Sequence, residues 1–280
     1  MLCQSKNRRL GMLDDLTNLQ ALLKDSTLLA TKGYIAGEWC DGENGQTFPV
    51  YNPARGDVIT DVADISRTQT AEAISIAEKA QKLWAARPAK ERSNLLRNWY
   101  NLMMENQEDL ATILTAEQGK PIEEAKGEIA YGASFIEFFA EEAKRVYGET
   151  IPGHQSDKRI TVLKQPVGVA ASITPWNFPN AMITRKAGPA LAAGCAFIAR
   201  PAAETPLSAL AMGILADRAG LPKGILSIIP SSRSSEIGKE FCENPIIRKL
   251  TFTGSTEVGR ILLKQASEQI MKCSMELGGN

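Results

Sequence analysis

Apolar residues recur at intervals of three and four over much of the first half of the chain, which is the spacing of amphipathic helices. Between residues 69 and 146 this pattern predicts helices throughout. The last of them begins after the Gly-Lys-Pro segment 119–121, because proline is favoured at the first turn of a helix. In that helix Phe135, Phe138 and Phe139 fall on one stripe, which we expect to face the core.

The first sixty residues carry two other patterns. Residues 1–30 have leucines at helical spacing and are expected to form a helical leader. From residue 34 to about residue 60, short apolar runs are separated by the turn-forming pairs Asp41-Gly42, Asn44-Gly45 and Asn52-Pro53. This second pattern predicts a few short strands.

Residues 147–166 interrupt the helical pattern. The segment 147–153 is rich in turn-forming residues, and 159–164 alternates apolar and polar positions as a strand does. Two strands on either side of residues 153–158 would form a hairpin, and a lone hairpin is too small to be stable. We therefore expect the hairpin to pair with another part of the assembly, such as a second subunit, and to act as an oligomerisation arm.

After residue 166 strand and helix patterns alternate with short connections. The predicted strands are 167–174, 196–199, 225–229 and 249–252, and the predicted helices are 182–193, 205–219, 235–242 and 256–266. Such alternation is typical of a Rossmann-like α/β fold, a parallel sheet with helices on both faces. Because ligands of such sheets bind at the carboxyl ends of the strands, the loops to search are 175–179, 200–205, 230–235 and 253–259.

Composition removes several classes of function. The 280 residues carry 32 Lys and Arg against 32 Asp and Glu, and zero net charge argues against nucleic-acid binding and against a polybasic membrane anchor. A single histidine, His154, excludes metal centres built on several imidazoles, so no metal is expected. Five widely spaced cysteines without a CxxC pair favour a reducing compartment. With no apolar segment in the first nine residues, we expect a cytoplasmic protein.

Two loops carry candidate chemistry at the predicted ligand edge. The segment 252–259, Phe-Thr-Gly-Ser-Thr-Glu-Val-Gly, combines a strand end, a glycine turn and a helix start whose free N–H groups form an anion site. The same string also fits an ordinary helix start. In Thr-Pro-Trp-Asn-Phe-Pro, residues 174–179, two prolines fix a rigid loop that presents Trp176 and Asn177. The amide of Asn177 can donate to a developing oxyanion, and the alternative is a turn-stabilising Asn with a core Trp.

Two charged residues are further candidates. Arg200 ends a predicted strand and precedes a helix, where a cation would meet a ribose or a phosphate. An arginine at a strand end is also commonly just solvated. Glu276, beside two glycines, can serve as a general base, and it can equally be an acidic residue before a loop.

Together and in this order, the strings PWNFP, a basic residue followed by PAxxTP, FTGS and ELGGN resemble the NAD(P)-dependent aldehyde dehydrogenase superfamily. The runs at 114–121, 147–154 and 182–190 are similar to the succinate-semialdehyde dehydrogenases within it, of the bacterial type that degrades GABA. The resemblance covers nearly all of residues 32–280.

The resemblance implies a domain organisation. In the order of the chain, it consists of a helical leader (1–30), a cofactor-binding domain formed by 31–146 and 167–280 and incomplete at its end, and an oligomerisation arm at 147–166. The catalytic domain of the superfamily is absent. Relatives of this type form homo-oligomers, so we expect the same of the full-length protein.

The resemblance also implies a mechanism, in which a cysteine thiolate attacks an aldehyde, hydride passes to the nicotinamide, and a glutamate activates water. By motif, Asn177 stabilises the oxyanion and Glu276 is the general base. Arg185 matches the position that holds a substrate carboxylate, which favours succinate semialdehyde or a similar carboxylated aldehyde. The implied cofactor contacts are Trp176, Asn177, Arg200, Ala203, Gly254, Ser255 and Gly259.

The superfamily's nucleophile lies beyond ELGGN, and none of the five cysteines occupies that position. Cys273 is expected to be a buried structural thiol. We therefore expect this chain not to oxidise aldehydes by itself. It is either part of a longer oxidoreductase or a non-catalytic remnant that at most binds a nucleotide or a partner.

The cofactor is NADP or NAD. Ala203 stands where NAD-preferring relatives often place a glutamate that accepts the ribose hydroxyl, and Arg200, in place of the usual lysine, adds a permanent positive charge. These residues favour NADP, whereas Glu204 turning into the ribose site would favour NAD. The serine-rich loop 231–235 lacks the superfamily's glycine, which we expect to weaken cofactor binding.

Overall fold

A sheet lies at the centre of the part of the chain that the computed structural model describes, residues 16–278. Its strands are β1 (Gly33–Ile35), β2 (Glu38–Cys40), β7 (Val169–Ile173), β8 (Ala196–Arg200), β9 (Leu226–Ile228), β10 (Ile247–Ser255) and β11 (Lys272–Gly278). They are hydrogen-bonded in the order β11-β10-β7-β8-β9-β1-β2. The strands from β7 to β11 are parallel, and β7 and β8 are buried throughout, as expected of central strands covered on both faces.

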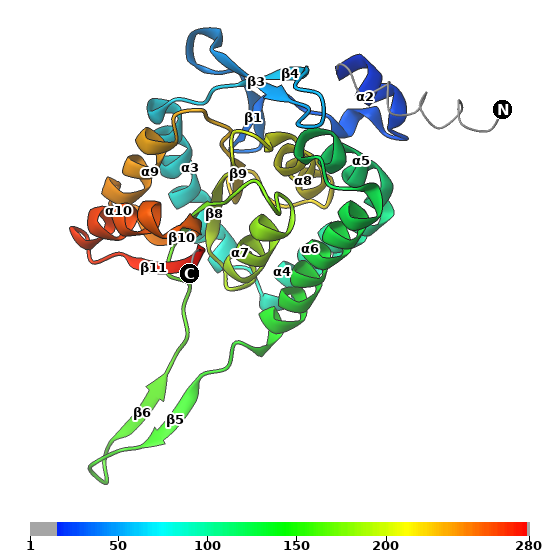
Figure 1. Ribbon diagram of the computed structural model, residues 1–280. Helices are drawn as coiled ribbons and strands as arrows, with labels where there is room; N and C mark the ends of the chain where they lie inside the picture. The colour runs from blue at the N-terminus through cyan, green and yellow to red at the C-terminus, as the bar shows by residue number, and fades with distance from the viewer. Residues whose placement is uncertain (1–15, 279–280) are drawn as a thin grey trace, which may run out of the picture.

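Helices cover both faces of this sheet (Figure 1). One layer holds α3 (Arg67–Ala85), α9 (Ser234–Glu243) and α10 (Thr256–Ser267), and the other holds α7 (Ala181–Ala192), α8 (Pro206–Arg218), α4 (Ala89–Glu105), α5 (Gln107–Gln118) and α6 (Ile122–Glu142). The predicted Rossmann-like α/β fold is confirmed, and each strand and helix predicted between residues 167 and 266 is present. None of the helices among residues 16–278 is both long enough and apolar enough to cross a bilayer.

The strand order creates a crevice at one place. The connections from β7 to β8 to β9 run in one direction across the sheet, and those from β9 to β10 to β11 run in the other. Because such crossovers are right-handed, α7 and α8 lie on one face and α9 and α10 on the opposite face. The chain therefore diverges after the neighbouring strands β7 and β10, and ligands of doubly wound sheets bind at this position.

The short strands predicted before residue 60 are present, but in two different places. β1 and β2 extend the central sheet beside β9 in antiparallel orientation, whereas β3 (Thr47–Tyr51) and β4 (Val58–Ala63) form a separate two-stranded sheet. At the other edge, β11 was not predicted. Glu276 therefore lies on a regular strand and not on a flexible segment before a loop.

The expectation that the aromatic stripe of α6 faces the core is confirmed only for Phe139, which packs against it, and is wrong for Phe138. Phe138 is 58% exposed, and Phe135 and Phe139 are half-buried. The buried face of α6 carries small and aliphatic residues together with Glu128, and α7 packs closely against it. A Cβ atom at Gly132 would lie 2.2 Å from Oδ1 of Asn180, so that position has no room for any side chain.

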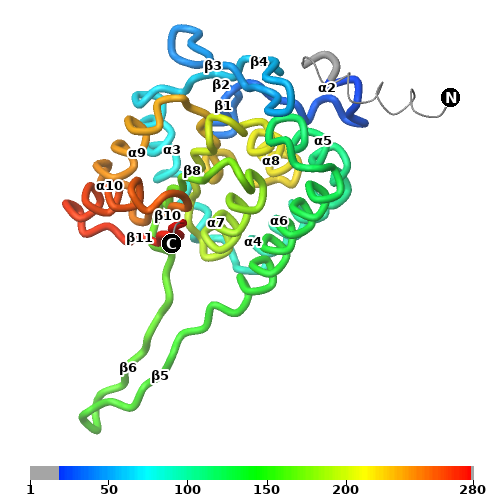
Figure 2. The backbone as a smooth tube through the Cα atoms, in the orientation of Figure 1, coloured from blue at the N-terminus to red at the C-terminus, as the bar shows by residue number. Residues whose placement is uncertain are grey.

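The predicted hairpin extends from the body of the molecule (Figures 1 and 2). It consists of β5 (Glu149–Pro152) and β6 (Arg159–Val162), whose residues are all exposed. The two strands form a sheet of their own, without further strands from the described part of the chain. Its role as an oligomerisation arm stays a prediction.

The predicted helical leader lies partly outside the described residues. Of residues 1–30, the structure shows the short helix α2 (Leu16–Leu22), which packs against α5. The chain after α2 is fixed by a buried carboxylate on α5, because Asp109 accepts the backbone N–H groups of Lys24 and Asp25 at 2.9 and 2.8 Å.

Candidate functional site

The loop after β7 contains two of the predicted site residues. Thr174, at its start, donates its backbone N–H to the carbonyl oxygen of Arg200 at 3.2 Å, which ties the loop to the end of β8. Trp176 is 53% exposed, and Asn177 is also exposed. The alternative of a core tryptophan is therefore wrong, and both side chains are accessible to a ligand at the crevice.

The helix start after β10 lies beside this loop. Phe252 of β10 is paired with Ile173, the last residue of β7. Ser255 caps α10, since its hydroxyl accepts the N–H of Val258 at 3.3 Å. Helix geometry leaves the other N–H groups of this first turn free to bind an anion. A Cβ atom at Gly254 would lie 2.4 Å from the Phe252 ring, so only glycine fits there.

Gly259 has a packing function that the sequence analysis missed. It is buried on α10, and a Cβ atom there would lie 2.5 Å from Cδ2 of Leu277 on β11. The glycine therefore allows α10 to approach the edge strand. This contact explains the residue without a cofactor, and its predicted cofactor contact stays a prediction.

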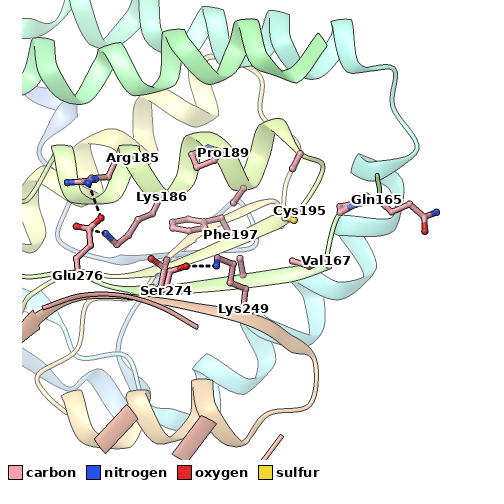
Figure 3. A pocket seen from close by; sticks show the side chains of 15 residues that line it. Gln165, Val167, Arg185, Lys186, Pro189, Cys195, Phe197, Lys249, Ser274 and Glu276 are labelled. Atoms are coloured by element: carbon pink, nitrogen blue, oxygen red, sulfur yellow. Dashed lines mark hydrogen bonds and ion pairs between the residues drawn. The ribbon is translucent and has the colours of Figure 1, made fainter. Parts of the chain in front are cut away.

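Glu276 and Arg185, which sequence reasoning assigned to different tasks, lie in direct contact (Figure 3). Nη2 of Arg185 on α7 lies 2.8 Å from Oε1 of Glu276 on β11. The other carboxylate oxygen accepts the hydroxyl of Thr253 at 3.1 Å and lies 3.8 Å from Nζ of Lys186. The carboxylate is thus held from three sides.

Lys186 is a site residue that the sequence analysis missed. Its side chain is buried, its ammonium donates to the Thr253 hydroxyl at 2.7 Å, and burial lowers its pKa despite the attraction of Glu276. Two cations, Arg185 and Lys186, therefore face the single carboxylate of Glu276. The excess positive charge can attract a second anion to this cluster. Both carboxylate oxygens of Glu276 contact protein donors, so we expect Glu276 to leave the guanidinium before it binds a water molecule as a base.

A cavity of about 400 Å³ opens next to this cluster, on the α7 face of the sheet (Figure 3). The charged groups of Arg185, Lys186 and Glu276 line it at one place and Lys249 at another, and most of its remaining wall is apolar, including Ala170 and Phe197. A largely apolar volume with a few charged groups suits a short organic molecule that carries a charged end.

Replacing Glu276 with glutamine is expected to change the free energy of unfolding by less than about 1 kcal/mol, because ion pairs between partly exposed side chains contribute little. Urea unfolding of the wild type and of the E276Q variant measures the difference, with the exposed Glu124→Gln as the matched control. A loss above about 2 kcal/mol would show that the pair holds β11 in place.

Arg200 is not a solvated strand end. The residue is 7% exposed, and its Nη2 donates to the carbonyl oxygen of Ser231 at 2.8 Å. Burial lowers the pKa of its guanidinium, while Glu204 and Asp64 attract the charge and oppose this effect. Its Nε is buried without a protein partner in the described part of the chain, as is the hydroxyl of Thr174.

The serine-rich loop that follows β9 is fixed by Asp64, which the sequence analysis did not identify. Asp64 accepts the hydroxyl of Ser231 at 3.0 Å, the N–H of Ser232 at 3.0 Å and the hydroxyl of Ser232 at 2.6 Å. Ser231 and Ser232 thus hold this loop against the body of the protein.

These groups fit a dinucleotide. The first turn of α10 suits a pyrophosphate, and the exposed Trp176 ring offers a stacking surface. Nε of Arg200 and the hydroxyl of Thr174 have no protein partner in the described part of the chain, but both atoms are buried, so they would have to become exposed before they could bind a ribose. All of them lie at the carboxyl ends of β7, β8 and β10.

Comparison with known proteins agrees with this geometry. The model of the aldehyde dehydrogenase family matches residues 39–280. Glutarate-semialdehyde dehydrogenase of Pseudomonas aeruginosa is 59% identical over 258 residues, which are 92% of this chain and 53% of that protein. Succinate-semialdehyde dehydrogenase [NADP(+)] GabD of Escherichia coli is 57% identical, with the same coverage of both chains.

Solved structures show the same likeness. The crystal structure of an E. coli NADP-dependent enzyme superimposes with a TM-score of 0.91 at 57% identity, covering 92% of this chain and 53% of that one. Betaine aldehyde dehydrogenase of Staphylococcus aureus in complex with NAD+ gives 0.89 at 31% identity, covering 94% and 52%.

The chain spans about half of the length of the curated relatives it matches. Within that half, the family match extends through both strands of the crevice and reaches Glu276. The chain therefore belongs to the aldehyde dehydrogenase family.

Proposed function

We propose that this chain provides the dinucleotide-binding half of an NAD(P)-dependent dehydrogenase that oxidises a short aldehyde with an anionic end, such as succinate semialdehyde, to its acid. The observation that carries the proposal is the contact of Arg185 with Glu276 beside the 400 Å³ cavity. The relatives named for glutarate semialdehyde, succinate semialdehyde and 3-sulfolactaldehyde all act on aldehydes with an anionic end. A guanidinium is well suited to bind either a carboxylate or a sulfonate.

In this proposal the substrate activates the base. An incoming carboxylate binds Arg185 and replaces Glu276, which is then released to accept a proton from water. Lys186 keeps the released carboxylate close to the crevice. The exposed amide of Asn177 donates to the oxygen that becomes negative. The bound nicotinamide supplies the hydride acceptor.

We do not assign the thiol nucleophile to this chain. Burial raises the pKa of the thiols of Cys40, Cys195, Cys242 and Cys273, so none of these is a ready thiolate, and Cys3 lies outside the described residues. In the proposed enzyme the nucleophile belongs to the half of the relatives' length that this chain does not span. The 280 residues alone are then expected to bind a dinucleotide without oxidising aldehydes.

For the cofactor we propose NADP in preference to NAD. Position 203 offers no carboxylate to repel a 2′-phosphate, and one relative at 57% identity is named as an NADP(+) enzyme. Since Arg200 is buried against Ser231, its charge supports this preference only if the guanidinium turns toward the ribose. We further propose a cytoplasmic homo-oligomer, formed through the arm, with a role in GABA degradation.

The test is a titration of the 280-residue chain with NADPH and with NADH. Trp176 is the exposed tryptophan at the crevice, so energy transfer from it to a bound nicotinamide should give a saturable signal that is smaller in the W176F variant, which keeps the other three tryptophans. We expect NADPH to bind at least about tenfold more tightly than NADH, because one charge-assisted hydrogen bond to the 2′-phosphate contributes about that factor in affinity.

Two results would contradict the proposal. Absence of saturable binding for both nucleotides, by calorimetry as well as fluorescence, would remove the dinucleotide assignment and leave the non-catalytic alternative. Formation of NADPH from succinate semialdehyde by the purified chain would show that it contains its own nucleophile.

A further inference from the structure

Lys120 lies between two helices whose ends fix its backbone. Gly119 ends α5 in the left-handed conformation, with φ of 84°, which glycine adopts without strain. Pro121 is the N-cap of α6, and its ring restricts the backbone on the other side. The lysine thus starts from a rigid point.

The ammonium group of Lys120 makes three contacts that join separate elements. Its side chain is 10% exposed, and Nζ lies 2.6 Å from Oε2 of Glu128 on α6. The same nitrogen donates to the carbonyl oxygen of Asn177 at 3.1 Å and lies 3.8 Å from the ring centroid of Phe178. One buried cation therefore binds the backbone of the oxyanion-donor candidate and the ring that follows it.

Glu128 completes the connection. Its other oxygen, Oε1, accepts the backbone N–H groups of Asn180 at 3.0 Å and Ala181 at 3.2 Å, at the start of α7. The pair therefore holds the loop after β7 at two points, through the carbonyl of Asn177 and through the N–H groups where the loop enters the helix.

We propose that Lys120 is a positioning residue, whose ammonium group fixes the segment from Trp176 to Phe178 so that the Asn177 amide keeps its orientation at the crevice. The role of Asn177 as a donor rests on the proposed function, whereas the order of the loop does not. An oxyanion donor has to be held to about 0.5 Å to be effective, and an exposed loop residue has no packing of its own to provide this.

A lysine suits this task better than a neutral residue. The Glu128 carboxylate is 1% exposed and needs a cation, since removal of its partner would leave a buried charge unpaired. The ammonium group has three donor directions, so it can bind the carboxylate and the carbonyl and still face the ring of Phe178.

The chain itself offers the probe for a test. It contains four tryptophans, and each gives one fluorine resonance when the protein is labelled with 5-fluorotryptophan. Trp176 lies next to Asn177 in the chain, and the W176F variant identifies its resonance. Trp84 and Trp99 are buried elsewhere and report on the fold. In K120M we expect the Trp176 resonance to move by more than its line width toward its position in the urea-unfolded chain, with Trp84 and Trp99 unchanged.

Three further variants make the result decisive. K120R keeps a cation and is expected to restore the Trp176 resonance, and K126M, which removes a lysine of α6 paired with Glu108 and Glu123, is expected not to move it. If K120M does not fold, F178L removes the ring contact alone and should shift the same resonance. An unmoved Trp176 resonance in K120M and F178L, or four resonances that move together in every folded variant, would overturn the proposal.

NADPH binding plays no part in this readout, so the dinucleotide proposal can fail independently.

Discussion

Replacement of Glu128 by alanine is expected to lower the free energy of unfolding by about 3–5 kcal/mol, as for other buried ion pairs that lose one partner. Lys120 would remain almost fully buried without its carboxylate, and the N–H groups of Asn180 and Ala181 would lose their acceptor. Both effects act at the junction of α6 and α7, where the two helices pack closely.

Urea unfolding followed by circular dichroism measures this loss, and Glu124→Ala is the matched control. Glu124 lies one turn earlier on α6 and is exposed, so its removal should change the midpoint little. E128Q separates the two contributions, since glutamine keeps an oxygen for the N–H groups but not the charge. If E128A were no less stable than E124A, the carboxylate would have no structural role at this junction.

The contrast between these two glutamates shows what the sequence could not reveal. Both belong to a helix that begins with several charged residues, and a charged helical stretch indicates a solvated face. Burial of Glu128 results from the approach of α7, which comes from a distant part of the chain. For the same reason Lys186 and Asp64 were not predicted as parts of the site.

The helices and strands after residue 166 were predictable, because their periods differ and their turns carry glycine or proline. β11 carries the alternation of a strand, with apolar residues at 273, 275 and 277, but the sequence analysis read its end as a loop because of the glycines there. The strand forms because β10 supplies a hydrogen-bonded edge along its length. An edge strand of this kind depends more on its neighbour than on its own composition.

The sequence predicted individual site residues but not their contacts with one another. Local strings indicated Asn177, Ser255 and Glu276, and the resemblance added Arg185, but no string indicated that Arg185 and Glu276 form an ion pair. Their contact depends on the strand order β11-β10-β7, which places the end of β11 near α7. Strand order is a property of the whole sheet and cannot be deduced from periodicity.

A second buried glutamate is expected to make stability depend on pH. Burial raises the pKa of Glu117 to about 8, and the charge of Glu128 adds to this, against the hydrogen bonds it accepts from the N–H groups of Leu207 and Ser208, both at 2.7 Å. In the unfolded chain the pKa of this carboxyl is near its ordinary value of 4.5. Between these values the folded protein binds a proton that the unfolded chain has lost.

The contribution of Glu117 to the free energy of unfolding should therefore be highest below about pH 4.5. It should fall as the pH rises to about 8, by at most about 1.4 kcal/mol per pH unit. In the variant Glu117→Gln this contribution disappears. Since its amide nitrogen would face one of the two N–H groups, the variant is also about 1–3 kcal/mol less stable than the wild type at low pH, where both side chains are neutral. Because only the wild type then loses stability through this position, the two curves should converge as the pH rises and cross before pH 8.

Urea unfolding at pH 5, 6, 7 and 8 tests this expectation in the wild type, in E117Q and in the exposed control E124Q. Other titrating groups give the same slope in all three proteins, so only the difference between the curves concerns Glu117. Parallel curves for wild type and E117Q would mean that the carboxylate stays ionised throughout, stabilised by the start of α8. Converging curves would mean that α8 begins on a protonated acid at neutral pH, and that its anchorage beside the crevice weakens as that proton is lost.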